Sequence, residues 1–100
     1  TVLRRIWCEL CKAVGWMHGV GLVHRDIKLE TPFIKLTDFG LSRFVEIDAN
    51  GDAELLSTRC GSEAYAAPEL VTGGGGASGR GVYDARKTDA WACGVVLYAL

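Results

Sequence analysis

The sequence predicts a mainly α-helical, α+β fold, and three observations support this. Apolar residues recur at three- and four-residue steps over residues 3–17, residues 33–37 alternate in polarity, and residues 90–100 are apolar almost throughout. The first pattern is typical of a helix with one buried face, the second of a short strand, and the third of an apolar helix. A chain of 100 residues is expected to form one domain or part of one.

The helix of residues 3–17 is predicted to have a broad buried face. Its apolar positions are Leu3, Ile6, Trp7, Leu10, Cys11, Val14 and Met17. Gly19 and Gly21 are expected to end this helix, because glycine readily adopts the left-handed conformation that closes a helix. His24 then lies in a loop.

The rest of the chain is predicted to contain three further elements and a flexible tract. Residues 33–37 form a short strand that Asp38 closes. Pro68 starts a short helix, at a position where its missing N–H does no harm, and residues 73–81 are a flexible glycine tract. The last, apolar helix is expected to start at Ala90.

Composition and charge narrow the class of protein. The chain is 49% hydrophobic and 23% charged, with a net charge of −1, as in an ordinary globular domain. A nearly neutral chain offers no basic surface for nucleic acid or acidic lipid, so no nucleic-acid or membrane partner is predicted. Residues 90–100 reach about half the length that a membrane span needs.

Two of the four cysteines form a C-x-x-C motif, Cys8 and Cys11, which raises the alternatives of zinc binding or redox chemistry. Zinc would need a second pair of ligands at short spacing, and a redox motif would need a strand before it. Here the pair lies inside a helical pattern, where positions i and i+3 share a face. We interpret these residues as packing cysteines in a reducing compartment, which predicts a cytoplasmic location with the nucleus left open.

Three short motifs occur in a fixed order along the chain. They are His24-Arg25-Asp26-Ile27-Lys28, Asp38-Phe39-Gly40 and Ala67-Pro68-Glu69. In this order they resemble the catalytic loop, the metal-binding turn and the end of the activation segment of protein kinases. The resemblance covers residues 1–100 and implies a partial large C-terminal lobe of a protein-kinase-like fold. It also implies transfer of the γ-phosphoryl group of ATP to a protein hydroxyl, with Mg²⁺ as the cofactor.

Each candidate catalytic residue suits one requirement of that reaction. A carboxylate must take the proton of the attacking hydroxyl, a cation must offset phosphate charge, and oxygen ligands must hold Mg²⁺. Asp26, Lys28 and Asp38 fit these three tasks in turn. Asp26 and Lys28 are two residues apart, so on an extended loop their side chains point the same way. A lysine at this position is typical of family members that modify serine or threonine.

The resemblance implies further contacts with the nucleotide and the metal ion. It assigns Glu30 to the nucleotide site together with Lys28. It places Thr31 where the family usually has an asparagine that binds Mg²⁺, and a threonine hydroxyl is a shorter and poorer ligand. Phe39 is expected to be buried, and Gly40 to permit a sharp turn.

Residues 58–69 resemble the end of the activation segment in serine/threonine kinases. Thr58 occupies the position that is often phosphorylated, with Ser57 as the nearby competitor. Ser62 matches the hydroxyl residue that contacts the catalytic Asp and Lys and helps to dock the substrate. Arg25 and Arg43 match a cationic pocket for a phosphate on Thr58, although either arginine also reads as an ordinary surface charge.

Residues 89–96 resemble the central buried helix of the large lobe. There the aspartate, here Asp89, holds the backbone of the catalytic loop from below, so we interpret it as support rather than as a catalytic residue. Leu29 and the run Cys60-Gly61-Ser62 favour the calcium/calmodulin-dependent-like group of kinases.

The chain departs from the family pattern in two places. Between Thr31 and Asp38 lie six residues, too few for the hairpin of roughly 8–12 residues that the family folds there. Either a short segment with the asparagine is missing, or the deletion is real and the protein is degenerate. The small lobe, with its glycine-rich lid and its lysine, is also absent before residue 24. We therefore expect the fragment alone to be inactive, with a non-catalytic pseudokinase-type binding module as the alternative.

Overall fold

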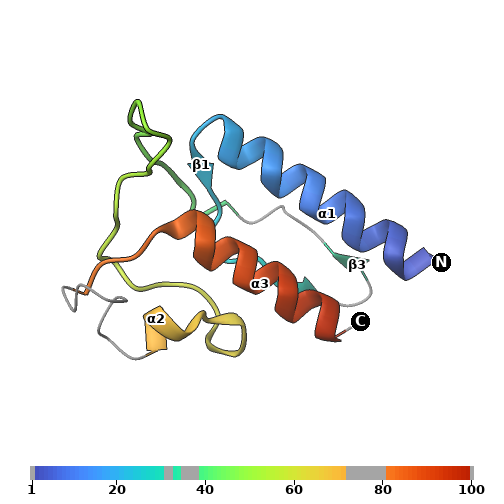
Figure 1. Ribbon diagram of the computed structural model, residues 1–100. Coiled ribbons are helices and arrows are strands. Elements are labelled where there is room, and N and C mark those ends of the chain that lie inside the picture. Colours follow the sequence, from blue (N-terminus) through green and yellow to red (C-terminus); the bar gives the residue numbers. More distant parts are fainter. Residues whose placement is uncertain (1, 31–32, 35–38, 72–80, 100) are drawn as a thin grey trace.

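Two helices that lie side by side dominate the computed structural model, as Figure 1 shows. The structure describes residues 2–30, 33–34, 39–71 and 81–99. Helix α1 spans Val2–Gly19 and helix α3 spans Ala85–Ala99. A short helix α2 (Pro68–Val71) and the 3₁₀ turn η1 (Glu63–Tyr65) lie on the side of α3 away from α1. The mainly helical α+β prediction is therefore confirmed.

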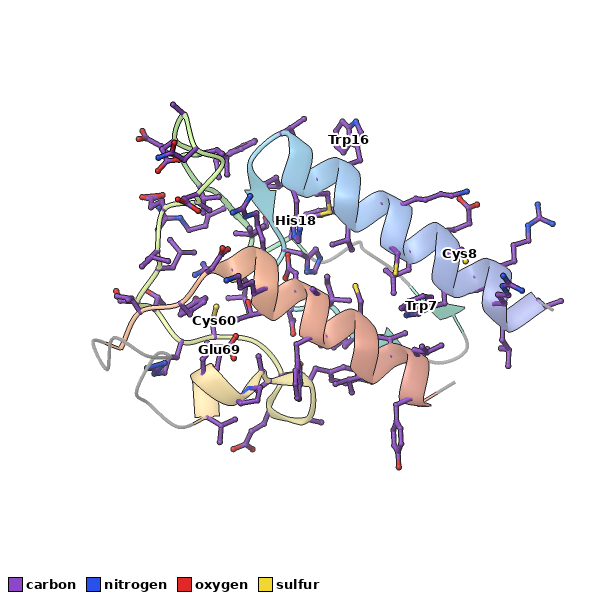
Figure 2. All side chains as sticks on the ribbon, viewed as in Figure 1. Trp7, Cys8, Trp16, His18, Cys60 and Glu69 are labelled. Atoms are coloured by element: carbon purple, nitrogen blue, oxygen red, sulfur yellow. The ribbon has the colours of Figure 1, made fainter. Side chains whose placement is uncertain are left out.

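Helix α1 follows the predicted period, but its buried face is shorter than expected. Leu10, Val14 and Met17 are buried, whereas Leu3 and Ile6 are 50% and 38% exposed. The expectation that the apolar face is buried from its start is therefore wrong. The buried residues of α1 begin at Leu10, and the helix packs against α3. The indole Nε1 of Trp7 donates to the Cys93 carbonyl on α3 at 2.9 Å, and Figure 2 shows this side chain between the two helices.

The end of α1 requires a glycine, as predicted. Gly21 has a φ of +80°, and a Cβ atom at this position would lie 2.9 Å from the Val45 carbonyl oxygen. A side chain would therefore be strained by its backbone and blocked by a neighbour. The turn sends the chain into β1 (Leu22–Val23), which pairs antiparallel with β4 (Arg43–Phe44).

A short hairpin forms directly after the catalytic loop. Strand β2 (Leu29–Glu30) pairs antiparallel with β3 (Phe33–Ile34), so that Leu29 lies opposite Ile34. This hairpin starts before the segment between Thr31 and Asp38, so the expectation that those six residues are too few for a hairpin stays a prediction. The first strand uses residues before Thr31, and a connection of two residues is the commonest in hairpins. The strand predicted over residues 33–37 is described at Phe33–Ile34 alone, and residues 35–38 lie outside the described part.

Two buried clusters of side chains hold these elements together. One lies between the two long helices and contains the isoleucine of the catalytic loop; the other lies under β1 and β4. The first consists of Leu10, Val14, Ile27, Ala92, Cys93 and Val96, and the second of Val23, Val45, Leu56, Tyr83 and Ala85.

Helix α3 is buried on one face and exposed on the other. It begins at Ala85, earlier than the predicted Ala90, and Thr88, Asp89 and Val96 are buried. Trp91 is 48% and Tyr98 93% exposed, so this apolar helix has an exposed face in the described structure. None of the helices in the described ranges has the length and apolar character of a bilayer span.

The two cysteines of the C-x-x-C motif lie in α1, inside a helix as predicted. Cys11 packs against the first cluster, and all four cysteines are free thiols. Among the described residues, no three His, Cys, Asp or Glu side chains come together as a group that could hold a metal ion.

The buried thiol of Cys93 gives the first testable prediction. Burial raises the pKa of Cys93 from 9.0 to about 12, and the neighbouring Cys11 and Asp89 add to this rise. We expect iodoacetamide at pH 8 to label Cys93 only after unfolding, because the reactive thiolate is almost absent in the folded protein. Mass spectrometry of the labelled peptides measures this, with the partly exposed Cys8 as the comparison.

The same shift fixes the sign of a pH dependence. A thiol whose pKa is raised by folding contributes stability below its unfolded pKa of 9.0, and this contribution is lost as the pH rises toward 12. The free energy of unfolding should therefore fall above pH 9, and Cys93→Ala should reduce that fall. Fast labelling of Cys93 in the folded protein would contradict this account.

Candidate active site

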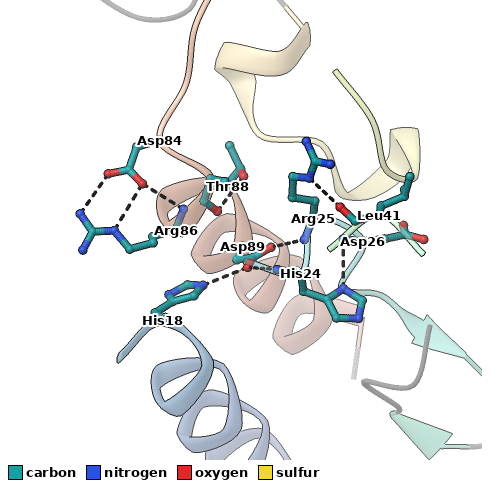
Figure 3. Close-up of polar contacts among 10 residues, drawn as sticks. His18, His24, Arg25, Asp26, Leu41, Asp84, Arg86, Thr88 and Asp89 are labelled. Atoms are coloured by element: carbon teal, nitrogen blue, oxygen red, sulfur yellow. Dashed lines mark hydrogen bonds and ion pairs between the residues drawn. The ribbon is translucent and has the colours of Figure 1, made fainter. Parts of the chain in front are cut away.

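A single buried carboxylate anchors the loop that carries the candidate catalytic residues. Asp89 lies on α3 and is 1% exposed. Its Oδ2 accepts a hydrogen bond from the His24 amide at 2.8 Å, and its Oδ1 accepts one from the Arg25 amide at 2.8 Å. Figure 3 shows both contacts converging on the one side chain. The interpretation of Asp89 as support for this loop is confirmed.

His18 is a third partner of this carboxylate, and sequence reasoning missed it. It lies in the last turn of α1, and its Nε2 is 2.9 Å from Asp89 Oδ2. The two residues are 71 positions apart in the sequence, so no local pattern links them. His18 thus brings the end of α1 to the same carboxylate that holds the loop.

The anchored amides fix an unusual backbone conformation. Arg25 has a φ of +68°, the left-handed region that non-glycine residues rarely adopt. The hydrogen bonds of the His24 and Arg25 amides to Asp89 offset a backbone strain of about 1–3 kcal/mol. The loop therefore turns sharply at Arg25, immediately before the candidate base Asp26.

Asp26 receives contacts from three directions. Ser62 donates to Asp26 Oδ1 through its amide at 3.1 Å and its hydroxyl at 2.9 Å. The Lys28 ammonium lies 3.7 Å from Asp26 Oδ2, as the two-residue spacing predicts. His24 Nδ1 accepts from the Asp26 amide at 3.1 Å. The structure thus brings together Asp26, Lys28 and Ser62, three of the predicted site residues.

A glycine next to Ser62 lets the activation segment approach the loop closely. Gly61 has a φ of +103°, and a Cβ atom there would lie 2.6 Å from the Arg25 carbonyl oxygen. No other residue fits without moving the backbone. Gly61 and Ser62 therefore sit directly on Arg25 and Asp26.

The aromatic residue of the metal-binding turn is less buried than expected. The ring of His24 packs edge-on against that of Phe39, with ring centroids 5.1 Å apart. Phe39 is nevertheless 45% exposed, so the prediction of a buried ring is wrong. The described aromatic ring against it is that of His24, on one edge, and one edge contact cannot cover a phenylalanine.

The two predicted phosphate-binding arginines lie in different surroundings. Arg25 Nε donates to the Leu41 carbonyl at 2.7 Å, and its Nη1 donates to the Tyr83 hydroxyl at 3.3 Å. Tyr83 in turn donates to the Thr58 carbonyl. Arg43 instead pairs with Glu54 at 3.2 and 3.4 Å. Arg25 is thus linked to Thr58 through Tyr83, whereas the described contacts of Arg43 lead to Glu54.

Several predicted contacts of the nucleotide and the metal ion fall outside the described structure. Thr31 and Asp38 are not among the described residues. Glu30 is described as a backbone position in β2, opposite Phe33. The described part of the site does fit a phosphate group: Lys28 places an ammonium beside Asp26, on a loop whose backbone is fixed by Asp89.

Comparisons with known proteins match the whole chain. Residues 1–100 match the family model described as protein kinase domain. The serine/threonine-protein kinase KIN4 of Saccharomyces cerevisiae is 45% identical over 96% of this chain, and CBL-interacting protein kinase 22 of Oryza sativa subsp. japonica is 43% identical over 97%. Serine/threonine-protein kinase kin-29 of Caenorhabditis elegans is 43% identical over 100%.

This chain corresponds to a small part of those relatives. It spans 12% of KIN4, 22% of CBL-interacting protein kinase 22 and 11% of kin-29. The match to kin-29 extends over 106 residues although this chain has 100, so at least some residues of kin-29 have no counterpart here.

The anchoring role of Asp89 gives the second prediction. Asp89→Asn replaces one carboxylate oxygen, which accepts hydrogen bonds, by an NH₂ group, which donates them. The loop amide that donated to this oxygen, of His24 or of Arg25, then loses its partner. We expect this to cost about 2–3 kcal/mol of local stability. Amide hydrogen exchange at His24 and Arg25, measured by mass spectrometry or NMR, should become roughly 30- to 150-fold faster.

Asp52→Asn is the matched control, because Asp52 is an exposed aspartate in the turn after β4. Its exchange rates at His24 and Arg25 should equal those of the unmodified protein. Equal rates in the Asp89→Asn variant would show that the loop does not depend on this carboxylate.

Proposed function

The chain belongs to the protein kinase family, and from that premise we propose that the protein containing it transfers the ATP γ-phosphoryl group to serine or threonine hydroxyls of proteins. The observation that carries this proposal is the set of contacts made by the Asp26 carboxylate. Its carboxylate is held by Ser62 on one oxygen and faces Lys28 with the other. Both the matched relatives and the Lys28 position favour serine and threonine as acceptors.

In the proposed reaction, Asp26 accepts the proton of the substrate hydroxyl through Oδ2. The hydroxyl oxygen forms the new bond to the γ-phosphorus as the bond to the β-phosphate oxygen breaks, and ADP leaves. Lys28, 3.7 Å from Oδ2, offsets negative charge on the transferring group. Ser62 keeps Asp26 Oδ1 occupied, so the carboxylate cannot rotate freely.

The residues that we propose for nucleotide and metal binding lie partly outside the described ranges. Mg²⁺, when bound, neutralises phosphate charge, and we assign Asp38 as its ligand, with Thr31 as the weaker second candidate. Glu30 and Lys28 are the proposed contacts of the nucleotide. Because the sequence has no glycine-rich lid or family lysine before residue 24, we propose that these 100 residues alone do not transfer phosphate.

Regulation through Thr58 is a further part of the proposal. Thr58 is exposed in the activation segment. The Tyr83 hydroxyl hydrogen-bonds both the Thr58 carbonyl and the Arg25 guanidinium, so Arg25 lies near Thr58. A phosphate on Thr58 would attract both guanidinium groups. Arg43 would have to leave its ion pair with Glu54 to bind this phosphate. That pair is exposed and contributes about 0–1 kcal/mol to stability.

A non-catalytic binding module is the alternative function. Two observations favour it: Thr31 stands at the position of the family's metal-binding asparagine, and the segment up to Asp38 is short. The described part of this segment, Phe33–Ile34, pairs with Leu29–Glu30. Such a module would bind a protein through the substrate-docking face around Ser62.

The third prediction separates these two functions. In the full-length protein, Asp26→Asn should lower phosphate transfer to a serine-containing peptide by about 10²- to 10⁴-fold, because the amide cannot accept the proton. Incorporation of labelled phosphate from ATP measures the rate, with Asp52→Asn as the control that should retain full activity. Transfer that survives in Asp26→Asn would disprove the role of Asp26, and no transfer in the unmodified protein would favour the binding module.

A further inference from the structure

Tyr83 connects parts of the site that no sequence motif relates to it. The residue lies just before α3 and is 4% exposed, within the second buried cluster. Its amide donates to the Leu56 carbonyl at 2.8 Å, and its carbonyl accepts from the Leu56 amide at 2.8 Å. The backbone of Tyr83 is thereby fixed to the start of the segment that leads to Thr58.

The hydroxyl of Tyr83 bridges a charged side chain and the activation segment. It donates to the Thr58 carbonyl and accepts from Arg25 Nη1 at 3.3 Å. Burial raises the pKa of the Tyr83 phenol, so the group remains protonated and able to donate at neutral pH. A hydrogen bond with a charged partner on one side is stronger than one between neutral groups.

Among the described residues, this bridge and the contacts of Ser62 attach the two ends of residues 58–62 to the catalytic loop. At one end, Tyr83 ties the Thr58 carbonyl to the Arg25 guanidinium. At the other end, Ser62 binds the Asp26 carboxylate. The exposed residue Arg59 lies between the two attachments. Neither attachment requires a phosphate group.

We propose that Tyr83 is a positioning residue that holds the substrate-docking segment on the catalytic loop while Thr58 is unphosphorylated. The catalytic consequence rests on the proposed kinase function, but the tether itself does not. Removing the hydroxyl leaves the Thr58 carbonyl and one N–H of Arg25 without this partner. The segment between the two attachments then opens more often, and a protein substrate docks less tightly.

Tyr83→Phe in the full-length protein tests the tether, in a Thr58→Ala background that excludes phosphorylation and keeps the main-chain carbonyl. Limited proteolysis by trypsin reports opening as the rate of cleavage after Arg59. We expect this rate to rise about tenfold, the effect of losing one hydrogen bond to a charged group. Tyr98→Phe in the same background is the matched control, because none of the hydrogen bonds described for the two attachments involves Tyr98.

Two results of the proteolysis would overturn the proposal. One is an Arg59 cleavage rate equal to that of the Tyr98→Phe control. The other is an equal rise in cleavage after Lys12 in α1, which would mean that the substitution loosens the whole structure. A selective rise at Arg59 supports the tether even if no variant transfers phosphate, in which case the kinase function alone fails.

Steady-state kinetics tests the positioning role in a protein that transfers phosphate. Tyr83→Phe should raise KM for a serine peptide several-fold and leave KM for ATP unchanged, because the hydrogen bonds of the Tyr83 hydroxyl lead to Arg25 and Thr58 and not to the proposed nucleotide contacts. An unchanged peptide KM, or an equal rise in both KM values, would refute the positioning role.

Discussion

The whole arrangement depends on the buried carboxylate of Asp89. A charge that is 1% exposed is costly unless its oxygens are matched by donors, and here two loop amides and His18 surround it. The hydrogen bonds to this carboxylate join α1, α3 and the catalytic loop at one point. They also stabilise the left-handed conformation of Arg25, which a loop of this sequence would not adopt unaided.

The position of the activation segment follows from that anchor. Because the Arg25 backbone is fixed, its carbonyl can approach Gly61, and the next residue, Asp26, faces Ser62. The Arg25 side chain extends the other way, to Leu41 and Tyr83. Two consecutive loop residues therefore organise both the turn that follows Asp38 and the segment that would dock a substrate.

The predictions from sequence succeeded where a residue's role is local. The period of α1, the glycine that ends it and the spacing of Asp26 and Lys28 depend on neighbours within a few positions, so the sequence alone indicates them. The hairpin was missed because strands of two residues have no measurable period. The expectation of a buried Phe39 came from the family resemblance and not from a local pattern. Exposed apolar residues are in fact common on protein surfaces.

The sequence by itself determined the family, through the order of three motifs, and the residue types available for chemistry. It also determined α1, whose amphipathic period is a local property. Only the tertiary structure decided the partners: His18 on Asp89, Tyr83 between Arg25 and Thr58, and Glu54 on Arg43. Contacts such as Arg25 with Tyr83 join residues 58 positions apart. Such a pair leaves no periodic signal along the chain, since its geometry exists only in the folded structure.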